Sequence, residues 1–226
     1  MTGYARRVGI VLWKDLLVER RSKESLNALF FFGLLLLFLF QFSLGSDRAR
    51  LESALPGMLW LGFVLAGLLG LGRSFLAERE NDCWEGLVLT AGDKSAIYLG
   101  KLAANVCVMG AVELVILLLF GLFFDVDLGR AAAGLIVILP LGTLGLAAVG
   151  TLFAAVTAQV RARELLFPVL LLPVQVPVLL ATVSATQVAL AGQPLGDAAP
   201  WLRLLAGADL VYLVIGILTF EFVLEG

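Results

Sequence analysis

The residue types that this chain lacks limit the chemistry open to it. Its 226 residues include no histidine, which removes the most common general base, metal ligand and haem axial ligand. The sequence has no GxxxxGK[ST] nucleotide-binding loop and no HExxH or GxSxG hydrolase motif. We therefore expect no catalytic residues, no metal site and no directly bound cofactor, and any ATP must be hydrolysed by another polypeptide.

One carboxylate, Glu113, lies within a long apolar run. An ionised carboxylate in the bilayer interior costs about 3 kcal/mol or more, so we expect Glu113 to face protein, cavity water or a neutralising partner. Two interpretations stay open: a protonated carboxyl that serves packing alone, and a group on a substrate path or at a moving helix. An intramembrane enzyme would need several such groups, and the spans add only Asp209 and Glu221.

Prolines are the second unusual feature of an apolar run. The stretch FPVLLLPVQVPVLLATVSATQ contains Pro168, Pro173 and Pro177, and an internal proline removes an amide donor and clashes with the carbonyl four residues earlier. We therefore predict that this helix is bent or broken at Pro173 and Pro177, with Gln175 as a candidate partner for the freed carbonyls. A flexing helix and a static kink are both compatible with the spacing.

Membrane-spanning helices must position these residues. Hydrophobic residues make up 61% of the chain and charged residues 15%, against roughly 45–50% and about 25% in soluble domains. The apolar runs reach the roughly 20 residues that cross a bilayer as a helix. Small residues in the fourth run (Gly142, Gly145, Ala148, Gly150) favour close helix packing or a subunit contact. The sequence predicts one all-α integral membrane domain over residues 1–226, with six transmembrane helices at about 26–45, 55–71, 102–124, 131–160, 165–191 and 204–224.

Basic residues orient these spans. The segments on one side of the predicted membrane hold twelve lysines and arginines, and those on the other side hold four. Because positively charged segments stay in the cytoplasm, both termini are expected there. The uneven spread of the positive charges forms no nucleic-acid-binding patch, so we expect membrane lipid and no nucleic acid as a partner.

The first 25 residues have apolar side chains at three- and four-residue spacing, with basic residues on the other side. Trp13 adds a side chain that favours the headgroup layer. The pattern predicts an amphipathic helix along the inner membrane surface, against the alternative of a charged, poorly ordered tail. The apolar positions are Tyr4, Val8, Val11, Leu12 and Leu16.

The longest polar stretch runs from Arg73 to Lys101, on the predicted cytoplasmic side. It combines alternating charges with an apolar patch at Trp84, Leu87 and Val88, followed by a turn-like Ala91-Gly92-Asp93. A short amphipathic helix and a turn fit this order.

Three stretches carry a resemblance to a known family. They are ARLESALPGMLWLGFVLAGLLGLGRSF around the second span, GLVLTAGDKSAIYLGKLAAN from Gly86 to Asn105, and FPVLLLPVQVPVLLA from Phe167 to Ala181. In their order and spacing the chain resembles the cytochrome c maturation protein CcmB family, the permease subunit of the so-called haem exporter, over nearly its whole length.

The resemblance implies partners and a location. It implies a homodimer in the bacterial inner membrane, docked on two copies of an ATPase subunit, CcmA, with contacts to CcmC, CcmD and the haem chaperone CcmE. Two roles are attached to this family: export of haem, and ATP-driven release of haem-loaded chaperone from CcmC. The missing histidines favour the second role, although Met, Cys or Tyr could still ligate a passing haem.

The resemblance also gives the polar stretch a role, because the connection between the second and third helices resembles a coupling element that fits a groove on the ATPase. A charged segment with one aromatic anchor also suits docking on physical grounds, against the alternative of a merely solvated loop. Two other functions stay open: an ATP-independent membrane scaffold for cytochrome c assembly proteins, and the permease of another ABC exporter. The predicted docking residues are Glu78, Arg79, Glu80, Trp84 and Glu85.

Overall fold

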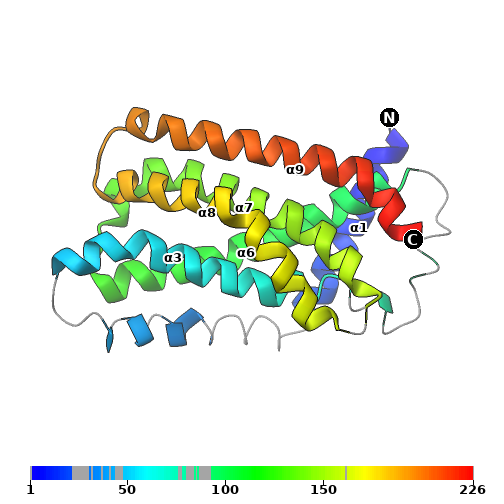
Figure 1. Ribbon diagram of the computed structural model, residues 1–226, viewed down its shortest axis with the longest axis horizontal. Helices are drawn as coiled ribbons and strands as arrows, with labels where there is room; N and C mark the ends of the chain where they lie inside the picture. The colour runs from blue at the N-terminus through cyan, green and yellow to red at the C-terminus, as the bar shows by residue number, and fades with distance from the viewer. Residues whose placement is uncertain are drawn as a thin grey trace.

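The described part of the chain is helical and contains no strand. The computed structural model describes residues 2–21, 31, 33–36, 38–40, 42–43, 48–75, 78–79, 84, 86, 93–160 and 162–225. Its elements, labelled as in Figure 1, are α1 (Thr2–Arg21), α3 (Arg48–Leu71), α6 (Ser95–Phe124), α7 (Leu128–Ala158), α8 (Arg163–Leu190), the 3₁₀ turn η1 (Leu195–Ala198) and α9 (Ala199–Glu225).

Five stretches in the described part of the chain are long and apolar enough to cross a membrane. They match the second to sixth predicted spans and lie at Leu51–Leu71, Ser95–Phe124, Leu128–Ala158, Arg163–Leu190 and Leu195–Glu225. Half of the first predicted span falls outside the described residues, and those of its residues that are described are helical. The count of six therefore stays a prediction.

The two chain ends lie at the same end of the helix bundle, where α1 crosses beside the end of α9 (Figure 1). We call this end the terminal face. Lys94, just before α6, pairs there with Glu225 at the end of α9. The connections between α6 and α7 and between α8 and α9 lie at the opposite end (Figure 1), as the predicted alternation of spans requires.

Small residues on α7 allow its neighbours to approach closely. A Cβ atom at Gly142 would lie 2.1 Å from the Trp60 ring of α3 and 2.7 Å from Thr182 of α8. Trp60 is 1% exposed and donates its indole N–H to Thr186 at 2.8 Å. Gly142 thus belongs to the contact of α3, α7 and α8 within one chain, which supports the packing interpretation of the small residues.

The proline-rich helix α8 is bent rather than broken. It continues from Arg163 to Leu190 through all three prolines, and its axis changes direction between its yellow first part and its orange end (Figure 1). Gln175 is fully buried and donates to the carbonyl of Gly145 on α7 at 3.1 Å. It therefore ties α8 to α7 and does not serve the carbonyls freed by Pro173 and Pro177.

Helix α6 begins at Ser95, seven residues before the predicted start of the third span. Its first turns are covered by α1: Tyr4 hydrogen-bonds to Ser95 at 2.7 Å, and a Cβ atom at Gly100 would lie 2.6 Å from that of Val11. Tyr98 is fully buried and donates to the carbonyl of Ala148 at 3.0 Å. Packing against α1 and α7 therefore stabilises polar turns that hydropathy alone assigns to the connection.

Candidate functional site

Four charged side chains form a cluster at the terminal face. Lys101 Nζ of α6 lies 2.9 Å from Glu78 Oε1 and 3.1 Å from Asp15 Oδ2 of α1. Lys14 Nζ pairs with Glu78 and lies 2.9 Å from Asp15 Oδ1. Two lysines and two carboxylates thus join α1, α6 and the connection between α3 and α6. We call these residues the terminal-face ion cluster.

Lys101 lies at the centre of this cluster and is 1% exposed. Besides the two carboxylates, it donates to the carbonyl of Ser74 at 2.6 Å, and its Nζ lies 4.3 Å from the centre of the Phe75 ring. A lysine ammonium has three donors, and Asp15, Glu78 and Ser74 accept all three. The buried charge is therefore fully partnered, as a low-dielectric site requires.

The cluster stabilises its own charged forms. Burial alone raises the pKa of Glu78, but Lys101 and Lys14 outweigh burial, so the pKa lies below its ordinary value. Burial lowers the pKa of Lys14, but its bonds to Glu78 and Asp15 outweigh burial, so this pKa is raised. Both shifts keep the ion pairs charged over a wide pH range around neutrality.

The connection between α3 and α6 contains the predicted docking residues. Glu78 is 5% exposed and belongs to the ion cluster. The guanidinium of Arg79 donates to the carbonyl of Ala158 at the end of α7. The Trp84 ring packs edge-on against Phe75 at 6.0 Å. Glu80 and Glu85 lie outside the described residues.

Phe75 extends these contacts to the last helix, because its ring lies 6.1 Å from that of Phe220 on α9. The connection between α3 and α6 therefore contacts α1 and α6 through Glu78, α7 through Arg79 and α9 through Phe75. The structure brings Glu78, Arg79 and Trp84 to the terminal face but uses each of them in contacts within the chain.

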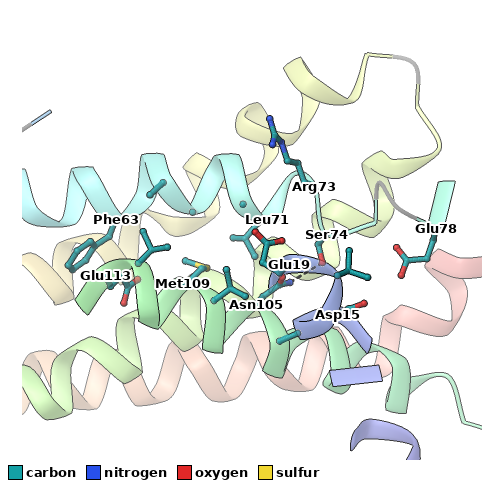
Figure 2. Close-up of a pocket in the computed structure, with 17 residues that line it drawn as sticks. Asp15, Glu19, Phe63, Leu71, Arg73, Ser74, Glu78, Asn105, Met109 and Glu113 are labelled. Atoms are coloured by element: carbon teal, nitrogen blue, oxygen red, sulfur yellow. Dashed lines mark hydrogen bonds between the residues drawn. The ribbon is translucent and has the colours of Figure 1, made fainter. Parts of the chain in front are cut away.

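A pocket leads from the ion cluster toward the membrane interior. It is lined by residues of α1, α3 and α6 and has a cavity volume of about 80 Å³, several times the roughly 10–15 Å³ that one water molecule needs on this measure. Asp15, Arg73 and Glu78 lie at one end, and Phe63 and Glu113 at the other (Figure 2).

Glu113 lies at the inner end of this pocket and is 3% exposed. Thr143 of α7 hydrogen-bonds to Glu113 Oε2, while Oε1 has no hydrogen-bond partner. The structure therefore places Glu113 against both protein and a cavity, two of the surroundings that the sequence predicts. Midway along the pocket, Asn105 donates to Ser74 at 3.1 Å and to Thr151 at 2.8 Å.

The sequence did not identify Lys101 or Asp209 as site residues, although both are buried ionisable side chains in the structure. Lys101 was assigned only to the basic side of the membrane, and its partners are distant in sequence, so no local spacing signals the pairing. Asp209 on α9 was noted only for an enzyme alternative, yet it is 3% exposed and both of its oxygens lack a partner. Asp209 could have been identified from the sequence, because it is an acidic residue inside an apolar run.

Within the described ranges, no group of three or more His, Cys, Asp or Glu side chains could hold a metal ion. Cys107 is a free, exposed thiol.

Comparison with known proteins gives a consistent match along the chain. The profile of the CcmB protein family matches residues 6–225. The chain is 32% identical to "Heme exporter protein B" of Bradyrhizobium diazoefficiens over 185 residues, covering 82% of each protein. It is 31% identical to the protein of the same name from Pseudomonas aeruginosa over 194 residues, covering 86% of each. The corresponding Haemophilus influenzae protein is 30% identical over 177 residues, 78% of this chain and 79% of that protein.

Proposed function

Because the chain belongs to the CcmB protein family, we propose that it is the membrane-spanning permease subunit of an ABC transporter in cytochrome c maturation. In this proposal two copies of the chain dock on two copies of a separate ATPase subunit of the CcmA type, with CcmC, CcmD and the haem chaperone CcmE as further partners. ATP is bound and hydrolysed by the ATPase, and haem is the transported or handled species.

One observation carries the coupling part of this proposal: the connection between α3 and α6 contacts four helices at once. Glu78 links it to α6 through Lys101 and to α1 through Lys14, and Arg79 links it to the end of α7. A displacement imposed on this connection therefore acts on several helix ends together. That is the mechanical property that a coupling element needs in order to change helix packing.

Two contacts support a sixth crossing before α3. Phe38 packs edge-on against Phe123 of α6 at 5.2 Å, and a Cβ atom at Gly33 would lie 2.9 Å from Ile116. These residues lie along the part of α6 that is remote from the terminal face. We infer that the chain crosses a bacterial inner membrane six times and that α1 lies along its inner surface. The terminal face then lies on the cytoplasmic side, in agreement with the uneven distribution of lysine and arginine.

The pocket bears on the choice between the two family roles. Its lining contains four carboxylates and one guanidinium, and the two lysines beside it are paired with Asp15 and Glu78, so it offers no surplus positive charge to the anionic propionates of haem. A pocket of about 80 Å³ also holds only a few water molecules. Haem therefore does not fit in this pocket, and its export would need another path, such as one shared with a second subunit. Release of a haem-loaded chaperone needs no such path.

The proposal is tested by co-expressing the chain with a CcmA-type ATPase and purifying the membrane complex through a tag on the chain. The double variant Arg79→Ala and Trp84→Ala should lose the ATPase. The matched control, Arg130→Ala and Trp201→Ala, places the same substitutions near the opposite end and should retain it. No association of the native chain with any ATPase, or association unaffected by either double variant, would favour the scaffold alternative.

A further inference from the structure

Glu113 differs from other buried carboxylates because it combines depth in the membrane with access to a cavity. It lies twelve residues beyond Lys101 on α6, or about 18 Å along the helix axis at 1.5 Å per residue. Its Oε1 atom lacks a hydrogen-bond partner, and the side chain lines the inner end of the pocket (Figure 2). An unpartnered acceptor beside a cavity that admits water is a site for a proton donor.

The hydrogen bonds around Glu113 accommodate both of its protonation states. Thr143 Oγ1 is within bonding distance of Glu113 Oε2 and lies 2.8 Å from the carbonyl of Leu139, but a hydroxyl has only one hydrogen to donate. When Glu113 is ionised, Thr143 donates to the carboxylate. When Glu113 is protonated, its O–H donates to Thr143, and Thr143 donates to Leu139 instead. Rotation of one hydroxyl therefore satisfies either state.

The groups facing Glu113 are uncharged close by and charged only at the far end of the pocket. Phe63 of α3 lies beside it at the inner end of the pocket (Figure 2), and Thr143 hydrogen-bonds to it from α7. The charged lining groups lie toward the terminal face: Asp15 and Glu19 of α1, Arg73 after α3, and Glu78. At this mouth Lys14 and Lys101 pair with Asp15 and Glu78, and Arg73 acts on Glu19, so these charges balance and the polar mouth suits water rather than an ion of either sign.

We propose that the pocket between α1, α3 and α6 is a hydrated path along which Glu113 exchanges a proton with the terminal face. In the uptake step an O–H bond of a hydronium ion breaks, an O–H bond forms on the Glu113 carboxyl, and a neutral water molecule remains. The hydroxyl of Thr143 then turns from Glu113 to the carbonyl of Leu139. The site does not depend on the ATPase or on haem, so its test is independent of the proposed function.

Infrared spectroscopy of the full chain in lipid nanodiscs tests this site, because a protonated carboxyl has a distinct C=O stretching band. The Glu113 band is assigned by its loss in Glu113→Gln and by its shift in Thr143→Val, which removes the hydrogen bond to Glu113. Asp209→Asn separately identifies the band of the other buried carboxyl. On transfer to D₂O, the Glu113 band should shift at once, because pocket water carries the exchange.

A matched pair of variants tests the path itself. Val108 lines the pocket, whereas Val115 of the same helix is 42% exposed on the outer surface. Val108→Phe should slow deuterium exchange at Glu113 by roughly tenfold or more, because exchange then needs local opening, and Val115→Phe should leave the rate unchanged. The proposal is overturned if no Glu113 band is found at any pH, if the band exchanges no faster than that of Asp209, or if Val108→Phe has no effect.

Discussion

Lys101 Nζ lies 2.9 Å from Glu78 Oε1, with the two side chains 1% and 5% exposed. The pair joins α6 to the connection that follows α3, two parts of the chain that hydropathy analysis separates into a membrane span and a solvated loop. Because each charge is buried, neither is tolerated without the other. This ion pair therefore fixes the position of the connection relative to the helix that contains Glu113.

Removing the buried lysine should destabilise the fold strongly. Among the described residues, Lys101→Met leaves Glu78 with the half-exposed Lys14 as its ion-pair partner, and breaking a buried ion pair costs about 3 kcal/mol or more. Lys14→Met removes a lysine that is 46% exposed, so it should lower the free energy of unfolding by about 1 kcal/mol or less. Unfolding of the two variants in matched detergent measures the difference, and equal losses would contradict the central place of Lys101.

The ion cluster should also set a pH dependence. The lowered pKa of Glu78 contributes stability that is present above the ordinary carboxyl pKa of about 4.3 and is lost as pH falls through the lowered value. The raised pKa of Lys14 contributes stability that is present below its ordinary value and is lost as pH rises through the raised one.

The Glu78 part of this dependence is isolated by subtraction. The difference in melting temperature between the native chain and Glu78→Gln should be constant around neutral pH and should shrink in acid, as the native carboxylate becomes protonated. A difference that persists unchanged to the acid limit would show that Glu78 does not act through its charge.

Close packing at Gly142 gives a prediction for the bundle core. Gly142→Ala places a Cβ atom on the buried Trp60 ring, and overpacking of this kind costs about 1–3 kcal/mol. Gly110→Ala is the matched control, since no atom lies within 4 Å of its Cβ position. The control should be neutral or slightly stabilising, because alanine favours a helix more than glycine does. Thermal unfolding of the two variants tests this prediction. Equal changes in melting temperature would contradict close packing at Gly142.

The contact of α1 with α6 can be tested in the same way. Gly100→Ala sets a Cβ atom 2.6 Å from that of Val11 and 2.9 Å from the backbone oxygen of Val8, so α1 should be displaced from α6. Gly9→Ala on α1 itself meets no atom within 4 Å. Limited proteolysis at Arg6 and Arg7 should accelerate in Gly100→Ala only. Equal cleavage in both variants would show that α1 does not depend on this contact.

The sequence predicts the spanning helices well because their signal is local. Apolar runs identify the second to sixth spans, and the small residues of the fourth run correctly indicate close packing at Gly142. The start of α6 was missed because Tyr98 looks like a loop residue until α7 and α9 bury it, and Lys101 until it pairs with Asp15 of α1. When helices distant in sequence bury the first turns of α6, the local amino-acid composition does not reveal it.

The site was predictable only in outline. Glu113 was identified because a carboxylate in an apolar run is unusual, but its pocket depends on how α1 and α3 pack against α6. Glu78 was correctly placed in the polar connection, whereas its partner Lys101 could not be identified, because ion pairing across 23 positions follows from the tertiary fold. The docking role of all five predicted residues, Glu78, Arg79, Glu80, Trp84 and Glu85, stays a prediction.

ATP hydrolysis by the co-purified complex of this chain with a CcmA-type ATPase tests the central claim most directly. Hydrolysis should fall roughly 5-fold or more, the usual scale of coupling between sites, when Arg79→Ala and Trp84→Ala are introduced, while Arg130→Ala with Trp201→Ala leaves it unchanged. Hydrolysis that is the same with the native chain and with both double variants would contradict coupling through the connection between α3 and α6.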